Sequence, residues 1–412
     1  MKSNFSVLVY SSCIFNITLI FYELLSTVQF LNALENDEYG VPYESHIYTL
    51  AKKETDYNFS QIDASEKKIS KLGNEFFAWV LLSCTSMIFL QSKLRRFFLN
   101  GLDAKIGILP YRNDPNRRKE VNFIVIFSSS CLFCAYGNAF MRALGLQFDT
   151  IFSEMFFYIL LICVVLPFLI SLAHNLFRIY GSSLIVACYI TFYIKAIGEF
   201  FSQEQVDKKE FERVDIKRYS REVQNFLKQQ HLENKVFQEK NKSDSINAAL
   251  VGWGDYEHIE IYGEHKDFNN EQFESVLMHE IGHSKDYSLH KKIFMLFLIK
   301  AFEFAFMMYL YKNVAPKYVN ENLSQAGAFM IIYVIYEFYL NRYFMVFHKL
   351  TSQIAEKNAD IIAKNYGFGS NLAFVLFKIT IKSKESVVYT TLYNYFKSLH
   401  PTIYDRVEYL LE

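Results

Sequence analysis

The chain has 412 residues with 43 basic and 43 acidic side chains, so its formal net charge is zero. This balance argues against a nucleic-acid-binding protein, which needs a basic surplus to neutralise phosphates. Apolar residues make up 51% of the chain and charged residues only 21%, which argues against a disordered chain. The 15 glycines and 6 prolines are too few for the turns of an all-β fold. The remaining class is a helix-rich chain with more apolar surface than one soluble core of this length buries, which indicates a membrane protein.

Seven apolar segments are close to the length of about 20 residues that crosses a bilayer as a helix. They cover residues 6–33, 75–92, 121–141, 155–176, 181–201, 292–312 and 326–348. The first segment contains a single charge, Glu23, and we interpret it as a retained span because it is long for a signal peptide and has no small-residue cleavage site. Pro167 is expected to kink the fourth span.

The spans predict four consecutive parts of the chain. Residues 1–201 hold spans one to five, residues 202–291 form a soluble loop domain, residues 292–348 hold spans six and seven, and residues 349–412 form a C-terminal helical region. In the loop domain, the charged segment 208–230 has apolar residues at helical spacing and predicts an amphipathic helix, and the segments NKVFQ, INAALVGW and HIEIYG predict strands. Because two crossings return the chain to the same side of the membrane, residues near 280 and near 356 can meet.

One motif in the loop domain predicts metal chemistry. His279-Glu280-Ile281-Gly282-His283 lies on a predicted helix, where residues four apart project from one face, so its two histidines can share a zinc ion. Glu280, beside the first histidine, can take a proton from the attacking water and pass it to the leaving amine. Chance produces this pattern in on the order of one chain in a hundred of such composition. The alternative is a surface helix with satisfied histidines, but the apolar residues just before the motif indicate that one side of the helix is buried.

A catalytic zinc site needs a third protein ligand and an open fourth position. Glu356 and Asp360 are four residues apart on a predicted helix, so Glu356 can complete a His₂Glu set. Asp360 can then accept a hydrogen bond from the free ring N–H of a ligand histidine and fix its tautomer. The alternatives are that these two acids form a solvated helix face, or that Glu337 on the seventh span is the third ligand.

HEIGH, the later Glu-Lys-Asn-Ala-Asp and the terminal SLHPTIYDRVEYL together resemble the type I CAAX prenyl protease family. These are integral-membrane zinc metalloproteases that process prenylated a-factor and prelamin A. Of the family motif S-R-x-x-E-x-x-A-D, the Glu-x-x-Ala-Asp half matches at residues 356–360 and the Ser-Arg half does not. The family's C-terminal S-H-P-T/P-x-x-x-R is matched by His400-Pro401-Thr402 and Arg406, and its S-N-A segment is echoed by Ile246-Asn247-Ala248.

The resemblance implies a role for each matched residue. His279, His283 and Glu356 would bind one zinc ion, and Glu280 would act as general base and then as general acid. Asp360 would support a ligand histidine, and Asn247 would lie on the strand that pairs with an extended substrate. His400 would stabilise the oxyanion of the tetrahedral intermediate, with Arg406 helping to position it.

The resulting expectation is an all-α polytopic membrane protein of about seven transmembrane helices, with a small α+β zinc-metalloprotease domain. The family's spans form a barrel around a water-filled chamber, which would supply the water that bilayer hydrocarbon lacks. Charged residues in or near the spans are expected to line that chamber or to pair with one another: Lys195, Glu199, Lys300, Glu303, Glu337 and Arg342.

The resemblance implies removal of the last three residues from a protein with a prenylated C-terminal cysteine, and a second, upstream cut. The expected partners are that substrate and the lipid bilayer, without nucleic acid, and the chain is expected to be a monomer. Two alternatives stay open: a membrane quality-control zinc protease without prenyl specificity, and a catalytically silent membrane scaffold.

The expected location is the endoplasmic reticulum membrane, with the inner nuclear membrane as a second place. Lysines and arginines after the second span favour a cytoplasmic location for that loop, which would put the zinc region on the opposite side. The family places its catalytic loops on the cytosolic or nuclear side, and we follow the resemblance here because other loops of the chain are basic too.

Some positions depart from the family pattern. Ser288 stands where the family commonly has a histidine, five residues after the second ligand, although His290 is close. The family's G-F-N segment reads Gly145-Leu146-Gln147. These departures indicate a divergent member.

Overall fold

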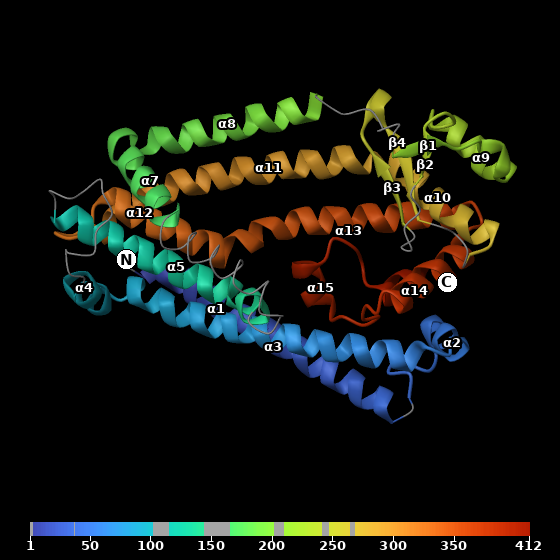
Figure 1. Ribbon diagram of the computed structural model, residues 1–412, viewed down its shortest axis with the longest axis horizontal. Helices are drawn as coiled ribbons and strands as arrows, with labels where there is room; N and C mark the ends of the chain where they lie inside the picture. The colour runs from blue at the N-terminus through green and yellow to red at the C-terminus, as the bar shows by residue number, and fades with distance from the viewer. Residues whose placement is uncertain are drawn as a thin grey trace. The chain divides into compact units, whose positions relative to one another are not determined.

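The structure is a computed structural model that describes residues 3–36, 38–101, 115–143, 165–201, 210–240, 247–263 and 268–412. The chain forms two compact units, each assembled from segments that are far apart in the sequence. Unit 1 comprises Met1–Phe21, Lys71–Lys195 and Lys300–Phe344, and unit 2 comprises Tyr22–Ser70, Ala196–Ile299 and Met345–Glu412. Figure 1 labels most of the helices and strands named below. Ile246, the Gly145-Leu146-Gln147 segment and the first half of the fourth predicted span lie outside the described residues.

Within the described residues, four helical stretches are long and apolar enough to cross a membrane. They are Asn4–Glu35, Tyr57–Leu90, Ser182–Glu199 and Ser288–Tyr318. These stretches contain or overlap the first, second, fifth and sixth predicted spans. The third and seventh predicted spans are helical but are not among the four, so the count of seven stays a prediction.

Unit 1 is built from helices. Its described elements include, in whole or in part, α1 (Ser3–Glu35), α3 (Tyr57–Leu90), α4 (Ser92–Gly101), α5 (Pro115–Ala143), α7 (Leu166–Tyr180), α8 (Ser182–Phe201), α11 (Ser288–Tyr309), a π-helical turn Leu310–Val314, a 3₁₀ turn Ala315–Tyr318, α12 (Gln325–Ile335), a second π-helical turn Tyr336–Leu340 and the start of α13 (Asn341–Asn365). Pro167 lies in the first turn of α7, where a missing N–H breaks no helical hydrogen bond. The predicted kink would fall at the boundary of the described residues, and it stays a prediction.

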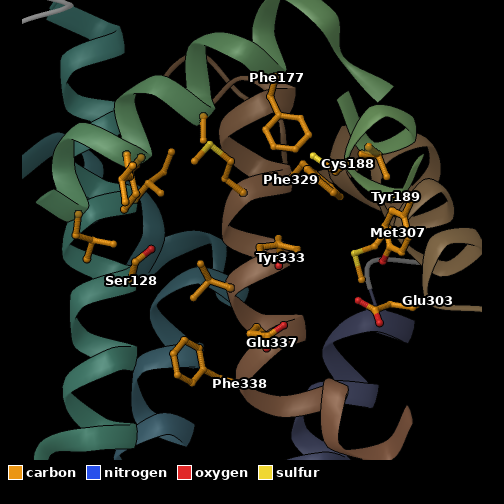
Figure 2. A pocket seen from close by; sticks show the side chains of 18 of the residues that line it. Ser128, Phe177, Cys188, Tyr189, Glu303, Met307, Phe329, Tyr333, Glu337 and Phe338 are labelled. Carbon is orange, nitrogen blue, oxygen red and sulfur yellow. The ribbon is translucent and has the colours of Figure 1, made fainter. Parts of the chain in front are cut away.

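Several charged side chains in unit 1 are paired or line a cavity. Lys300 donates to Glu303 at 2.6 Å, Asn341 donates to Glu337 at 2.9 Å, and Arg342 donates to Asn16. A cavity of about 760 Å³ with mostly apolar walls lies among α5, α7, α8, α11 and α12. Figure 2 shows Glu303, Glu337 and Tyr333 on its wall. The expectation that charges in the spans pair or face a cavity is therefore met for these side chains, whereas the predicted barrel and its chamber stay a prediction.

Unit 2 contains a four-stranded sheet. The strands are β1 (Phe211–Arg213), β2 (Val236–Glu239), β3 (Asn247–Val251) and β4 (His258–Tyr262), in the order β1-β2-β4-β3. β2 and β4 are parallel, and the other two pairs are antiparallel. Among the described residues, β3 is therefore an edge strand, paired on one side by β4. The three predicted strands are confirmed as β2, β3 and β4.

The prediction of one amphipathic helix over 208–230 was wrong. Its described part holds β1, a 3₁₀ turn Ile216–Arg218 and the short helix α9 (Arg221–Gln229). Asp215 and Ser220 each accept a hydrogen bond from a backbone N–H two or three residues later, so each starts a new turn of helix. The stretch before them pairs instead with β2.

The other helices of unit 2 enclose one core against the sheet. They are α2 (His46–Lys53), α10 (Asn270–Lys285), α14 (Gly369–Lys382), α15 (Thr391–Lys397) and α16 (Ile403–Leu411), with the greater part of α13. Core side chains come from α9, α10, α14, α16, β2 and β4, and include Phe226, Val236, Ile259, Ile261, Leu277, Ile281, Leu372 and Val407. Burial of each such side chain contributes roughly 1.5–3 kcal/mol. This core fixes one face of α10 and so positions the HEIGH motif that α10 carries.

The lone charge of the first predicted span is also paired in unit 2. Glu23 and Lys68 are buried, with Oε1 of Glu23 2.5 Å from Nζ of Lys68. Glu23 also accepts hydrogen bonds from the backbone N–H and the hydroxyl of Thr390, and Lys68 donates to the carbonyl of Val388 at 2.8 Å. This ion pair therefore anchors the segment that leads into α15.

Candidate active site

The helix α10 carries the HEIGH motif and is defined at both ends. Asn269 caps its first turn, and Gln272 reaches back to the backbone of Asn269 in a reciprocal capping box. The helix ends at Lys285, and the backbone N–H of the capping residue Asp286 still bonds to the carbonyl of Gly282. Because most residues of its last three turns are buried, the motif lies inside unit 2.

The glycine of the motif allows close approach of α13. A Cβ atom at Gly282 would lie 3.0 Å from both Cα and the carbonyl oxygen of Ala359. Two small residues therefore let the backbones of α10 and α13 meet, and Glu356, three residues before Ala359, is brought to the motif. The sequence-based expectation that residues near 280 and 356 can meet agrees with this contact.

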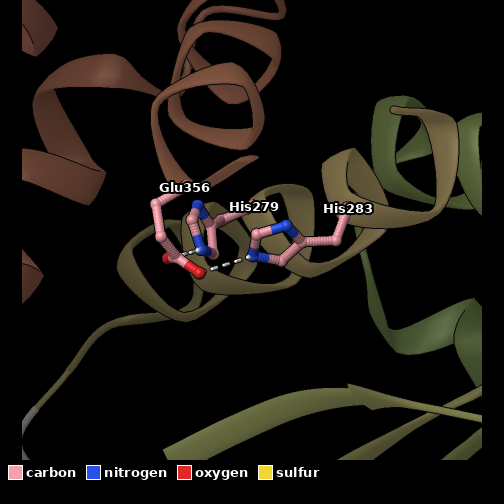
Figure 3. Close-up of side chains that lie close together, drawn as sticks. All are labelled: His279, His283 and Glu356. Atoms are coloured by element: carbon pink, nitrogen blue, oxygen red, sulfur yellow. Dashed lines mark ion pairs between the residues drawn. The ribbon is translucent and has the colours of Figure 1, made fainter. Parts of the chain in front are cut away.

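The side chains of His279, His283 and Glu356 converge (Figure 3). Nε2 of His279 lies 3.4 Å from Oε2 of Glu356, and Nε2 of His283 lies 3.5 Å from Oε1. One donor atom from each residue lies within 4.8 Å of the others. Two imidazole nitrogens and a carboxylate oxygen are the donor set of a catalytic zinc site with one position left open, so these residues fit a zinc ion.

The other ring nitrogen of each histidine has its own partner. Nδ1 of His279 lies 2.8 Å from Oδ1 of Asp360, and Nδ1 of His283 lies 3.2 Å from the hydroxyl of Ser288. Since these partners engage Nδ1, they leave Nε2 of both rings directed at Glu356. Such outer partners fix the tautomer and orientation of metal-ligating histidines.

Asp360 is itself held by α16. Arg406 donates two hydrogen bonds to it, Nε to Oδ2 at 2.8 Å and Nη2 to Oδ1 at 2.7 Å, and Tyr409 donates a third at 2.5 Å. The Asp360 side chain has no exposed surface. A buried carboxylate with a bidentate guanidinium partner is rigid, so it gives His279 a fixed support.

Burial and neighbouring charges set the protonation of the group. Burial, together with the nearby His279, lowers the pKa of His283 to about 3. Burial also disfavours a charge on His279, but Asp360 and Glu356 outweigh it and raise its pKa to about 10. Burial opposes the charge of Glu356 as well, yet the two histidines hold its pKa below the usual range. A divalent cation would displace the proton shared among these groups, as metal binding does at such sites.

Glu280 differs from Glu356 in its surroundings. Burial raises the pKa of Glu280 to about 7. Its Oε2 accepts a hydrogen bond from the backbone N–H of Leu250 at 2.9 Å. Leu250 belongs to the edge strand β3, so this carboxylate lies between the predicted metal ligands and the edge of the sheet.

Comparison with known families assigns this region. Residues 212–412 match the family model described as Peptidase family M48.

The chain carries a peptidase family M48 domain.

The whole chain is also similar in fold to a solved structure, the crystal structure of S. mikatae Ste24p. The match covers 99% of both chains with a TM-score of 0.58 at 15% sequence identity. A search of curated proteins by sequence finds no match. The M48 match supports a metalloprotease, and the fold shared with Ste24p agrees with the family resemblance that the motifs predicted. The four long apolar helical stretches of the described residues agree with a membrane protein. M48 metalloproteases use a zinc ion, which agrees with the His₂Glu group.

Three other predicted site residues of the M48 domain lie at different distances from the ligand group. Nε2 of His400 lies 3.7 Å from Oε1 of Glu356, and the His400 side chain is 61% exposed. Nη1 of Arg406 lies 3.9 Å from Oε2 of Glu356, although its hydrogen bonds go to Asp360. Asn247 lies at the start of β3, where its side chain accepts a hydrogen bond from the N–H of Ala248.

Two residues considered from the sequence are not part of the ligand group. Glu337 belongs to unit 1, where it accepts the hydrogen bond from Asn341. His290 packs its ring against that of Trp253, with 5.7 Å between the ring centroids. The third donor beside the two histidines is Glu356.

Sequence reasoning missed several side chains that support the M48 site. Ser288 was noted as a departure but not as a partner of His283. Ser352 and Gln353 occupy the Ser-Arg half of the second motif, so the departure there is confined to Gln353. Gln353 donates to the carbonyls of Asn394 and Ser398, which fixes the segment before His400. Tyr409 could have been found, because it lies three residues after Arg406 on one helix face.

Proposed function

We propose that this chain is a zinc endopeptidase of the CAAX prenyl protease type. The observation that carries the proposal is the convergence of His279, His283 and Glu356 directly beside Glu280. Its substrate would be a protein with a prenylated C-terminal cysteine, and the reaction would remove the last three residues, with a second, upstream cut.

Each residue of the site has its own role in peptide hydrolysis. A zinc ion held by His279, His283 and Glu356 would supply a Lewis acid that makes water a nucleophile at neutral pH and polarises the scissile carbonyl. Glu280 takes a proton from water as the water oxygen bonds to the carbonyl carbon. When the C–N bond breaks, Glu280 gives that proton to the nitrogen of the leaving peptide, so one water is consumed for each bond cut.

The edge strand β3 supports binding of an extended peptide. Among the described residues it is paired on one side only, and an extended segment can add to such an edge by main-chain hydrogen bonds. Glu280 is bonded to Leu250 of the same strand, so a peptide on this edge would pass next to the general base. Asn247 would bind the substrate at the start of the strand, and His400 would bind the developing oxyanion.

The prenyl specificity rests on the motifs together with the Ste24p-like fold. The same resemblance supports a monomer in the membrane of the endoplasmic reticulum and in the inner nuclear membrane, with the site on the cytosolic or nuclear side. The residues that depart from the family motifs, Gln353 and Ser288, favour one other candidate: a membrane quality-control zinc protease without prenyl specificity. A silent scaffold has no comparable support, because the ligand set and Glu280 are both present.

Matched peptides test the proposal. The purified full chain is given a farnesylated peptide with three residues after the cysteine, and the same peptide without the farnesyl group. We expect release of the last three residues, with kcat/KM at least roughly tenfold higher for the farnesylated peptide, about 1.4 kcal/mol of transition-state binding. A chelator should abolish the cleavage and added zinc should restore it.

Two outcomes contradict parts of the proposal. Equal rates for the two peptides would replace prenyl specificity with the quality-control function. Absence of cleavage by the zinc-loaded chain with either peptide would overturn the peptidase assignment itself.

A further inference from the structure

A lysine with no role in the motifs lies beside the ligand group. Lys292 is the fifth residue of α11, and its Nζ lies 3.7 Å from Oε1 of Glu356. Its side chain is 25% exposed, whereas that of Glu356 is 7% exposed. An ammonium group therefore reaches from the solvent-accessible edge of the site to the predicted carboxylate ligand.

Lys292 approaches the same oxygen as His400. Nε2 of His400 also lies 3.7 Å from Oε1 of Glu356, and Nε2 of His283 lies 3.5 Å from it. These three side chains come from α11, from the segment between α15 and α16, and from α10. The ammonium and the exposed imidazole thus gather at one side of the site, next to a ligand position.

Folding and metal binding do not account for a cation at this place. The distance of 3.7 Å exceeds that of a hydrogen bond, so the pair with Glu356 is a loose one. A positive charge so close to the ligands repels a divalent cation, and it also lies toward the helix end that favours negative charge. The positive charge of Lys292 is instead expected to be stabilising in a reaction step where negative charge develops in front of the metal ligands.

The neighbouring lysine shows the contrast. Lys291 is half exposed and donates to Asp286 at 2.7 Å, an ordinary surface pair. It makes no contact with Glu356 among the ion pairs of the described residues. Lys291 is therefore a matched control for a change of charge at this end of α11.

We propose that Lys292 is a catalytic residue that stabilises, together with His400, the negative charge on the scissile carbonyl oxygen. This inference rests on the proposed peptidase function. As the water oxygen bonds to the carbonyl carbon, the π electron pair of the C=O bond moves onto the carbonyl oxygen, and it returns when the C–N bond breaks. Lys292 keeps its proton throughout and acts only by its charge, which is already in place before the reaction starts.

The expected size of the effect follows from the geometry. Removal of one well-aligned oxyanion donor costs roughly 10²–10³-fold in kcat. Because Lys292 is partly exposed and therefore partly screened, we expect roughly 10- to 100-fold. A group that acts on the transition state changes kcat and leaves KM almost unchanged.

The test uses the full chain loaded with zinc, with the variants Lys292→Met, Lys292→Arg and the control Lys291→Met. We measure kcat and KM on the farnesylated peptide. We also measure, by calorimetry, the affinity of each variant for the phosphinic isostere of this peptide. The anionic tetrahedral group of the isostere mimics the transition state. Lys292→Met should lower kcat and the isostere affinity by similar factors, with zinc content unchanged. Lys292→Arg should keep most of the activity, and Lys291→Met should match the wild type.

Several results would overturn the inference. One is a wild-type kcat for Lys292→Met, and another is an equal loss of affinity for the substrate peptide and the isostere. A third is an effect on KM that disappears when the peptide ends in a carboxamide, which would assign Lys292 to recognition of the terminal carboxylate. If the wild type neither cleaves the peptide nor binds the isostere, the proposed function fails and this inference falls with it.

Discussion

Glu280 and Glu356 are two buried carboxylates of one site whose surroundings push their pKa values in opposite directions. Burial raises the pKa of Glu280 to about 7, whereas the two histidines hold that of Glu356 below its usual range. A carboxylate that titrates near neutrality suits a proton acceptor, and one that stays ionised suits a metal ligand. The two roles assigned from the sequence are therefore separated by environment as well as by position.

The change Glu280→Gln tests the role of Glu280 with little change in shape. The amide oxygen of glutamine can still accept from the N–H of Leu250, but the side chain cannot take a proton. We expect kcat on the farnesylated peptide to fall by roughly 10²–10⁴-fold. Zinc content should stay at the wild-type level, because Glu280 is not one of the three converging donors. Turnover within a factor of about ten of the wild type would rule out Glu280 as the base.

Part of the site could be predicted residue by residue, and the reason is local. The pairs His279 with His283 and Glu356 with Asp360 each lie four apart on one helix, so spacing alone puts them on one face. Ser288 could not be placed in this way. It follows Tyr287, whose φ of 52° turns the chain between α10 and α11, and its hydroxyl meets His283 only because of that turn.

At the scale of elements, the close contact between α10 and α13 assembles the ligands from two distant segments. Gly282 and Ala359 form this contact, and no pattern in either segment alone indicates it. The strands β2, β3 and β4 were predictable from short runs of apolar and β-branched residues. β1 was not, because its three residues are ordered by pairing with β2 rather than by their own pattern.

The contact at Gly282 gives a stability prediction. In Gly282→Ala, the new Cβ would press on the backbone of Ala359, which cannot move aside as a side chain would. We expect a loss of about 1–3 kcal/mol in the free energy of unfolding, together with weaker zinc binding. Thermal unfolding in detergent with and without zinc measures both.

Gly73→Ala is the matched control for this change. Gly73 lies in α3, and a Cβ added there would meet no atom within 4 Å, so the same substitution should be neutral or stabilise by up to about 1 kcal/mol. A Gly282→Ala variant as stable as Gly73→Ala would show that the approach of α10 and α13 does not need a glycine.

At the scale of the whole molecule, the apolar surplus and the zero net charge have a structural counterpart. Four described helical stretches can span a membrane, and two of the ion pairs within them are Glu23 with Lys68 and Lys300 with Glu303. Composition could predict the membrane, because it depends on total apolar content. It could not predict the partner of Glu23, which lies 45 residues away in sequence at Lys68, or the anchoring of Thr390.

The zinc content of the protein tests the central claim most directly, namely that His279, His283 and Glu356 hold a catalytic metal. The full chain and its Glu356→Ala variant are purified without chelator, and metal is quantified by atomic spectroscopy per folded chain. We predict about one zinc per chain in the wild type and well below one in the variant. A wild type without zinc, or a variant that keeps it in full, would contradict this claim.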